Sequence, residues 1–271
     1  MQLDKTLQPW RDYQLAKKYM WNPQDLALQT DARDWKILDA RAQDVILNLL
    51  SMFVNGEEAV ASELAPLLFA LGKIGGLREQ EMFVTTQIFD ESIHVEFFHR
   101  WFEEVVRDPV DHSKYWGANY RAIFDDALPH ALDALVADHS PRALARAFVA
   151  YHMVVEGTLA ETGYQAIFLA CQRKNVFPGL KQGIEYVKRD ESRHIAYGIY
   201  ALQRLIRSDR ALMEFVTDEL NRLLPFALGV IPDALAPYGD DVPFGIDLME
   251  MTEYAIDQFN KRLNAVERAA S

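Results

Sequence analysis

The sequence predicts an all-α protein built around a four-helix bundle, and three observations support this prediction. Apolar residues recur with the 3.6-residue period of an α-helix over four long stretches, near residues 33–71, 78–107, 141–173 and 179–207. Almost no segment alternates apolar and polar residues with the β-branched enrichment of a strand. No repeat, low-complexity tract or Gly/Ser linker divides the chain, so we expect a single domain over residues 1–271.

The remaining elements are shorter, and glycine or proline marks the breaks between helices. We expect residues 1–30 to be irregular with short helical pieces, and further helices near residues 119–137, 209–228 and 247–267. Ser140 is a favourable N-cap, and Pro141 after it suits the first position of a helix. The third long helix is therefore expected to begin there.

Composition limits the classes of function. Half of the 271 residues are hydrophobic, which is enough for a large core. The net charge of −12, without clustered lysine and arginine, argues against a nucleic-acid surface. The first residues do not resemble a signal peptide, and no window approaches the roughly eighteen apolar residues of a membrane span. The single cysteine, Cys171, excludes an intrachain disulfide, so we expect a cytoplasmic protein with an inert, buried thiol.

Two segments repeat the pattern Glu-x-x-His. FDESIH contains Glu91 and His94, and DESRH contains Glu191 and His194. On a helix this spacing places a carboxylate and an imidazole one turn apart on the same face, where both can bind one metal ion. One copy is weak evidence, but two copies within two long amphipathic helices point to a metal centre. An aspartate precedes each glutamate, either as a surface residue or as a partner that orients a histidine.

The other two long helices each supply an inward glutamate. Glu156 lies among apolar residues in the run YHMVVEG. At 100° per residue, Glu57 shares the apolar face of its helix, whereas Glu58 points about 100° away. This is the arrangement of ferritin-like di-metal carboxylate bundles, so we predict a ferritin-like four-helix bundle core with additional peripheral helices. The predicted metal ligands are Glu57, Glu91, His94, Glu156, Glu191 and His194.

The charge of the four clustered glutamates indicates that they bind metal ions. Carboxylates that face one another inside a bundle repel and lose hydration, and we expect no basic residue on those helix faces. Two divalent ions would cancel the four negative charges. Mixed imidazole and carboxylate ligands suit iron or manganese, and chemistry with O2 is the natural use of such a pair. The other histidines, which include His99 and His152, have no partner at ligand spacing and are expected to be ordinary.

With these residues placed, the sequence resembles the ribonucleotide reductase small-subunit superfamily, and within it the branch of ligand-binding oxidases. The resemblance covers roughly Trp21 to Leu263, and it is carried by GEEAV, FDESIH, YHMVVEG, TGY and DESRH. It implies a manganese/iron pair, a bound long-chain fatty acid and O2 activation by an enzyme. Manganese would bind Glu57, Glu91 and His94, and iron would bind Glu156, Glu191 and His194. Because these ligand types also accept two irons, di-iron is the alternative.

The resemblance further implies an ether crosslink between a tyrosine oxygen and the β-carbon of a valine. The matching residues are Val60, one helical turn after Glu57, and Tyr151, five residues before Glu156. Tyr164 matches another family tyrosine near the site. The loop GKIGGLREQ is one residue longer than the family pattern, so an alignment counted backwards from the second helix would select Glu58 in place of Glu57.

Two other functions remain as alternatives. A true reductase small subunit would generate a radical or a high-valent oxidant for a large subunit. The usual radical-tyrosine position, four residues after His94, holds Phe98, and no tyrosine or tryptophan follows Tyr254. A non-enzymatic ferritin-like metal or lipid binder is the second alternative. Homodimers are common in the superfamily, so we expect one here, with a separate electron donor that the residues do not identify.

Overall fold

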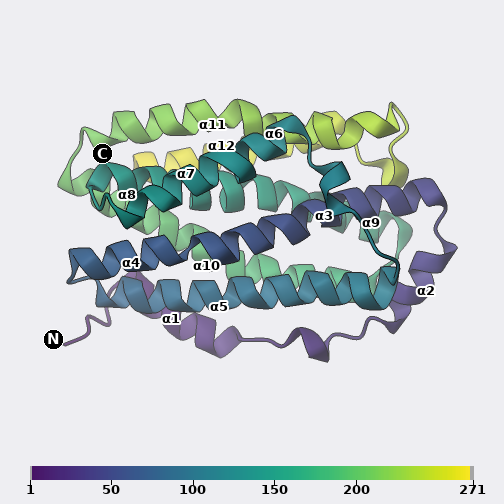
Figure 1. Ribbon diagram of the computed structural model, residues 1–271, viewed down its shortest axis with the longest axis horizontal. Helices are drawn as coiled ribbons and strands as arrows, with labels where there is room; N and C mark the ends of the chain where they lie inside the picture. Colours follow the sequence, from purple (N-terminus) through teal and green to yellow (C-terminus); the bar gives the residue numbers. More distant parts are fainter. Residues whose placement is uncertain (1, 269–271) are drawn as a thin grey trace.

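The protein consists of helices joined by short loops, as the computed structural model shows for residues 2–268 (Figure 1). No β-strand occurs within that range, which confirms the predicted all-α class. None of its helices combines the length and the apolar character that a membrane span requires. The α-helices are α1 (Gln8–Tyr19), α2 (Gln29–Ile37), α3 (Ala40–Glu63), α4 (Ala65–Ile74), α5 (Arg78–Trp101), α6 (Ala118–Arg121), α7 (Leu128–Asp133), α8 (Pro141–Phe148), α9 (Glu161–Lys174), α10 (Pro178–Ser208), α11 (Leu212–Leu235) and α12 (Leu248–Glu267).

Two rarer helix types complete the chain. The π-helical segments are η2 (Phe102–Val106), η4 (Ala122–Ala127) and η6 (Val149–Ala160). The short 3₁₀ turns are η1 (Pro23–Asp25), η3 (His112–Tyr115), η5 (Ala134–Val136), η7 (Ala236–Tyr238) and η8 (Pro243–Gly245). The segments α8, η6 and α9 follow one another without a break, and together they form one long helical rod.

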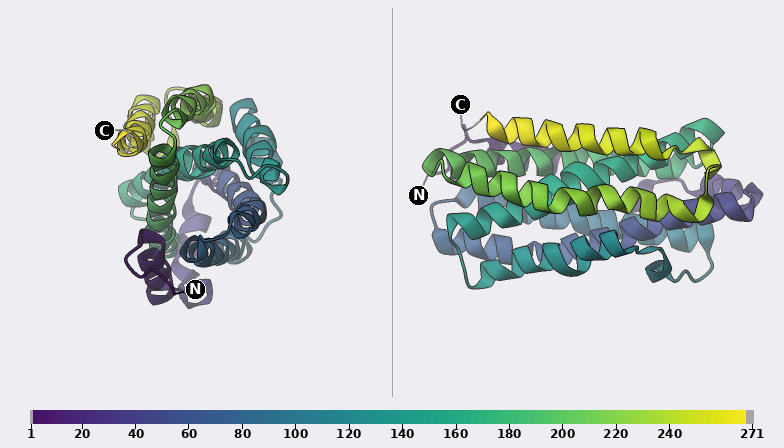
Figure 2. Two further views of the ribbon diagram at one scale, coloured as in Figure 1. Left: turned by 90° about the vertical axis from the view of Figure 1, so that its left-hand side faces the viewer. Right: turned by 90° about the horizontal axis from the view of Figure 1, so that it is seen from above.

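Four helical rods make the central bundle: α3, α5, α10 and the rod of α8, η6 and α9. In the left view of Figure 2, which looks along the bundle, α11 and α12 lie on one side of these four and α1 lies on the opposite side. Helix α1 packs against α5 and α10, and α11 and α12 pack against η6. Asp31 of α2 fixes the start of α10, because its carboxylate accepts hydrogen bonds from the backbone N–H groups of Gly179 and Leu180 at 2.8 and 2.7 Å.

The helix boundaries differ from the sequence expectation at the first long stretch. Residues 33–71 do not form one helix, because α2 ends at Ile37 and Asp39 caps α3 by accepting from the N–H of Ala42. A second break occurs at Leu64, with Pro66 in the first turn of α4. The apolar period continues across both breaks and hides them. The predicted cap at Ser140 is confirmed, since its hydroxyl accepts from Ala143 N at 3.2 Å.

Helix α11 is longer than the expected stretch of 209–228. It continues to Leu235 although Pro225 and Pro232 lie inside it. Each proline removes one backbone hydrogen bond, but the buried residues on both sides, such as Leu223 and Val230, keep the helix packed on its neighbours. Tertiary packing therefore outweighs the local signal of the prolines.

The core divides into two apolar clusters, and every central rod passes from one to the other. The first cluster contains Val60, Val84, Val155 and Tyr197, and the second contains Val54, Phe97, Tyr164 and Val187. In each rod one of the predicted ligand glutamates stands between a member of the first cluster and a member of the second. The fold thus brings four glutamates to one level between two apolar regions.

Close approach of α5 and α10 at Gly183 yields a stability prediction. A Cβ atom there would lie 2.1 Å from Cζ of the fully buried Phe97. We expect Gly183→Ala to lower the free energy of unfolding by about 1–3 kcal/mol through overpacking. The matched control is Gly72→Ala in α4, where the nearest atom is 3.9 Å away, and this change should raise stability by about 0.5–1 kcal/mol. Equal urea midpoints for the two variants would contradict this packing.

Candidate metal centre

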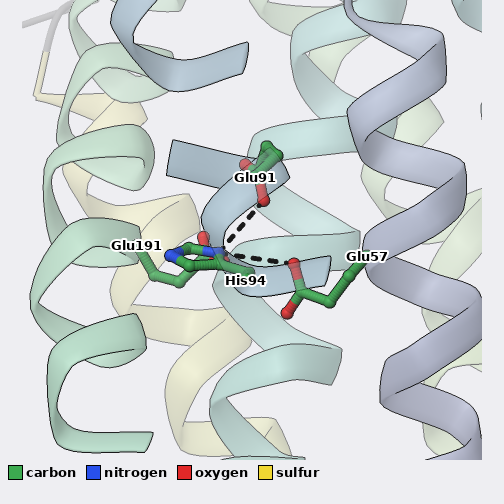
Figure 3. Close-up of side chains that lie close together, drawn as sticks. All are labelled: Glu57, Glu91, His94 and Glu191. Carbon is green, nitrogen blue, oxygen red and sulfur yellow. Dashed lines mark ion pairs between the residues drawn. The ribbon is translucent and has the colours of Figure 1, made fainter. Parts of the chain in front are cut away.

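The six residues predicted as metal ligands converge in the middle of the bundle and are all buried. Their ligand atoms form two groups, each with all members within 4.8 Å of one another. The first group is Glu57, Glu91, His94 and Glu191, which Figure 3 shows, and the second is Glu91, Glu156, Glu191 and His194. Because Glu91 and Glu191 belong to both groups, each could offer ligand atoms to either ion of a metal pair.

The first group gathers around Nδ1 of His94. This nitrogen lies 3.4 Å from Glu57 Oε2, 3.3 Å from Glu91 Oε2 and 3.6 Å from Glu191 Oε1. In Figure 3 these side chains point toward one another from α3, α5 and α10, with Glu91 and His94 both on α5. A single ion placed among them would meet one imidazole nitrogen and carboxylate oxygens from α3, α5 and α10.

The second group repeats this geometry around His194. Its Nδ1 lies 3.2 Å from Glu91 Oε1, 3.3 Å from Glu156 Oε1 and 3.4 Å from Glu191 Oε2. The rings of the two histidines are 6.3 Å apart between centroids. The two Glu-x-x-His motifs therefore present equivalent nitrogens to neighbouring positions.

Hydrogen bonding tests whether the cluster fits a pair of cations. Each of the six residues has a buried atom with no hydrogen-bond partner among the described residues: Glu57 Oε2, Glu91 Oε2, His94 Nδ1, Glu156 Oε2, Glu191 Oε2 and His194 Nδ1. Leaving such polar atoms buried and unpaired is costly. Two divalent ions would supply a partner for every one of these atoms, so the residues fit a dinuclear metal centre.

The acid-base properties of the six residues also fit a dinuclear metal centre. Burial raises the pKa of Glu57 to about 8 and also raises the pKa values of Glu156 and Glu191. Burial acts on Glu91 too, but its proximity to the imidazole of His194 holds its pKa well below the usual range. Without cations, the cluster must keep protons on some of its carboxylates, and metal binding would displace them.

The choice between Glu57 and Glu58 can be checked directly. Glu57 is 4% exposed and faces the centre, whereas the Glu58 side chain is 51% exposed. Glu58 lies 2.6 Å from Nε2 of His99 at the surface. The helix-face argument was therefore correct about which glutamate points inward, and counting residues backwards across the longer loop would have selected the wrong one.

The π-helix η6 explains how Tyr151 reaches the centre. Residues five apart in an α-helix point about 140° away from each other, but the wider turn of a π-helix brings them close to one face. The Tyr151 hydroxyl consequently donates to Glu91 Oε1 at 2.8 Å, although Glu156 of the same segment also faces the centre. The sequence expectation was an ordinary α-helix. The signal it missed was the five-residue spacing between two residues that both had to face inward.

A narrow apolar cavity of about 110 Å³ meets the metal centre on one side. Glu57, Glu156, Glu191 and Val60 line its inner end, and Tyr164 donates to Glu191 Oε1 at 3.3 Å nearby. The remaining walls come mainly from apolar residues of α3, η4, η6, α11 and α12. None of the described residues that line it is lysine, arginine or histidine.

Two aspartates support the histidines from behind. Asp90 Oδ2 accepts a hydrogen bond from His194 Nε2 at 3.3 Å, and Asp190 Oδ2 lies 3.5 Å from His94 Nε2. Trp21 also donates to Asp190 Oδ2 at 2.7 Å. The interpretation of Asp190 as a partner that orients a histidine is supported, and Asp90 has the same arrangement. Arg193 is buried against both aspartates, on the side of the histidines that faces away from the glutamates.

His152 was expected to be an ordinary histidine, and it belongs to neither group of ligand atoms, but it lies close to Glu156. It is fully buried, its Nε2 lies 3.3 Å from the Gln87 side chain, and Gln87 donates to Glu156 Oε1 at 3.0 Å. Burial holds the pKa of His152 well below its usual range, so the ring is neutral. His152 thus belongs to the surroundings of Glu156. Its position four residues before Glu156 was the signal that could have found it.

The fold and this site together define a ferritin-like bundle with a dinuclear carboxylate centre. Residues 5–268 match the family model described as ribonucleotide reductase, small chain, so the chain belongs to the ribonucleotide reductase small chain family. Similar solved structures are R2-like ligand-binding oxidases with Mn/Fe cofactors. One with an aerobically reconstituted cofactor after a long soak shares 35% identity over 98% of this chain and 95% of that chain, with a TM-score of 0.91.

The solved structures of two variants of such oxidases are similar to this chain to the same degree. A valine-to-isoleucine variant with an aerobically reconstituted Mn/Fe cofactor is 36% identical, covers 98% of this chain and 96% of that chain, and has a TM-score of 0.94. A tyrosine-to-phenylalanine variant with an anaerobically reconstituted cofactor is 35% identical, with the same coverage and a TM-score of 0.94. The chain is thus a homologue of these oxidases, which implies a di-metal oxidoreductase.

The raised pKa of Glu57 predicts how metal affinity depends on pH. Below about 8 the folded, metal-free protein carries a proton on Glu57, and a cation must displace it. Affinity for Mn²⁺ should therefore rise by about tenfold per pH unit for each proton released as the pH approaches about 8. Calorimetry in buffers of different ionisation enthalpy counts the protons. Glu58→Gln should leave this profile unchanged, and a flat profile for the unmodified chain would contradict the account.

Proposed function

We propose that this protein is an O2-activating oxidase that uses a manganese/iron pair, binds a long-chain fatty acid and forms an ether crosslink between Val60 and Tyr151. The observation that carries the proposal is a set of six buried ligand atoms without hydrogen-bond partners, at the inner end of an apolar cavity. The Mn/Fe cofactors of the similar oxidases support the choice of metals. Di-iron is the alternative for the same ligands.

The proposed ligands divide between the two positions by geometry. Glu57 and His94 would hold manganese, and Glu156 and His194 would hold iron. Glu91 and Glu191 lie within reach of both and would bridge the ions. Four carboxylates balance two divalent cations, so the filled centre is neutral in its reduced state. When bound, such a pair activates O2 and supplies electrons to it.

The cavity supports a fatty acid as the ligand. Its long walls are apolar, which suits an acyl chain, and the absence of a basic residue among its described lining leaves a carboxylate headgroup without a side-chain cation. The metal centre at the inner end would supply that positive charge. We therefore propose that the acid group binds at the centre and that the chain extends toward α11 and α12.

The crosslink rests on Val60 and Tyr151. Val60 is buried and lines the cavity beside Glu57, and Tyr151 donates to Glu91. Among the similar oxidases are variants substituted at a glutamate, a valine and two tyrosines. That glutamate and valine are separated by as many positions as Glu57 and Val60, and the two tyrosines by as many as Tyr151 and Tyr164.

The proposed reaction joins Val60 Cβ to the phenolic oxygen of Tyr151, and each atom gives up one hydrogen. O2 takes up these hydrogens and their electrons, together with an equal number of electrons from the metal pair and protons from solvent, and leaves as water. Burial raises the pKa of Tyr151 well above its usual value, so the phenol stays protonated until it reacts. Glu91, which already accepts this hydrogen bond, is placed to receive the proton.

A reductase small subunit is the second candidate, favoured by the description of the matching family model. Phe98, at the usual radical-tyrosine position, is fully buried and stacks on Phe53 with 5.2 Å between ring centroids, so it offers no phenol for a stable radical. Nucleotide reduction on addition of a large subunit would favour this candidate over the oxidase. The expected homodimer and cytoplasmic location are kept as parts of the proposal.

The crosslink can be detected by mass. After anaerobic loading with Mn²⁺ and Fe²⁺ and exposure to air, proteolysis should yield a fused peptide that contains Val60 and Tyr151 and lacks one hydrogen from each. Tyr151→Phe should abolish this peptide. Tyr164→Phe, which removes the hydroxyl near Glu191, should still form it. Separate peptides from the fully loaded, air-exposed protein would remove the main support for the oxidase.

The lipid part of the proposal has its own test. Organic extraction of the purified protein should release a fatty acid, measured by mass spectrometry as an amount per chain. Val230→Trp fills the cavity from α11 and should reduce this amount at least about tenfold, a loss of roughly 1.4 kcal/mol in binding. Phe226→Trp changes a 38% exposed position on the same helix and should retain the ligand. If the unmodified protein releases no fatty acid, or if the two variants release equal amounts, the assignment of the cavity as a fatty-acid site is wrong.

A further inference from the structure

We propose that Arg193 is a positioning residue that couples the two metal positions through Asp90 and Asp190. This inference rests on the proposed metal centre, and it concerns a residue that does not touch the metals. Arg193 stands inside the second Glu-x-x-His motif, immediately before His194. The corresponding position of the first motif holds Ile93, so a single arginine serves both motifs.

The two aspartates are crossed between the motifs. Asp90 precedes Glu91 on α5 but accepts from His194 on α10, and Asp190 precedes Glu191 on α10 but faces His94 on α5. Each histidine therefore takes its support from the opposite helix. In both cases Nε2 faces the aspartate and Nδ1 faces the glutamates, which fixes the orientation of the ring.

Arg193 ties these two supports together. One nitrogen, Nη2, lies 2.8 Å from Asp190 Oδ1 and 3.0 Å from Asp90 Oδ2. The Arg193 side chain is 7% exposed, and both aspartates are at least as well buried. A displacement of this guanidinium group would move both carboxylates, and with them both imidazoles.

The contact between Arg193 and the two aspartates also balances their charge. Two divalent ions cancel the four glutamates, but the aspartates add two more negative charges behind the histidines. Arg193 supplies one compensating charge between them, and Arg189, 3.4 Å from Asp190, supplies another nearer the surface. The arginine holds both carboxylates on the Nε2 side of the histidines, so each Nδ1 faces the glutamates, where a metal would bind.

Asp12 of α1 completes the surroundings of Arg193. Its buried side chain is close enough to interact electrostatically with Arg193, and burial raises the pKa of Asp12. The direct contacts of the guanidinium group are with Asp90 and Asp190, from two helices, and these contacts hold it in position.

Anaerobic titration with Mn²⁺ tests the coupling. In the metal-free full-length protein, Arg193→Met should weaken the affinity for both bound ions by about 10–100-fold, because partners behind metal ligands contribute that much. Arg193→Lys keeps a cation and should recover part of this loss at both positions. The matched control is Arg100→Met, which removes a guanidinium group with a 10% exposed side chain that pairs with Glu104 away from the centre. It should leave both affinities unchanged.

Thermal unfolding separates positioning from a general role in stability. A merely structural arginine would lower the Tm of metal-free and Mn²⁺-bound protein equally, whereas Arg193→Met should shrink the rise in Tm that Mn²⁺ causes. Asp90→Asn and Asp190→Asn should each weaken mainly one ion. If Arg193→Met does not fold, Arg193→Gln takes its place with the same expectations.

Two results would overturn the coupling: unchanged affinity for both ions in the Arg193 variant, or weakening of only one. Failure of the proposed function gives a different pattern. If the unmodified protein binds no pair of ions, the metal centre itself is wrong. If it binds two ions but forms no crosslink, the oxidase proposal fails while the assignment of Arg193 stands.

Discussion

Four carboxylates buried at one level of an apolar bundle are the constraint on which the rest of this structure depends. Glu57, Glu91, Glu156 and Glu191 come from the four central rods, and apolar clusters lie on both sides of them. Such a group is stable only if cations cancel its charge or protons occupy some of its carboxylates, and burial raises the pKa of Glu57, which favours the proton when no metal is bound. The histidines, aspartates and Arg193 are arranged around the first solution, in which cations occupy the centre.

Much of the fold and of the candidate site could be predicted because the signals were local. The 3.6-residue period identified the central rods, and the Glu-x-x-His spacing placed a carboxylate and an imidazole on one face of α5 and of α10. The same helical geometry selected Glu57 over Glu58, and the structure buries the first and exposes the second. Each of these conclusions needed only the angle between residues on one helix.

The features that the sequence did not reveal depend on contacts between helices or on departures from ideal geometry. The π-helix η6 changes which residues share a face, and this brings Tyr151 to Glu91. Arg193 and Asp90 meet across α10 and α5, which no spacing within one helix indicates. The breaks before α3 and at Leu64 were hidden because apolar residues continue in register across them.

Diffraction from crystals of the metal-loaded protein, recorded at the manganese and iron absorption edges, tests the central claim most directly. The account predicts two anomalous peaks between the central rods, each within about 2.0–2.2 Å of carboxylate and imidazole ligand atoms. Manganese should lie beside Glu57 and His94, iron beside Glu156 and His194, and Glu91 and Glu191 between them. Peaks outside this cluster, or a single ion that leaves one of the two histidines without a metal, would contradict it.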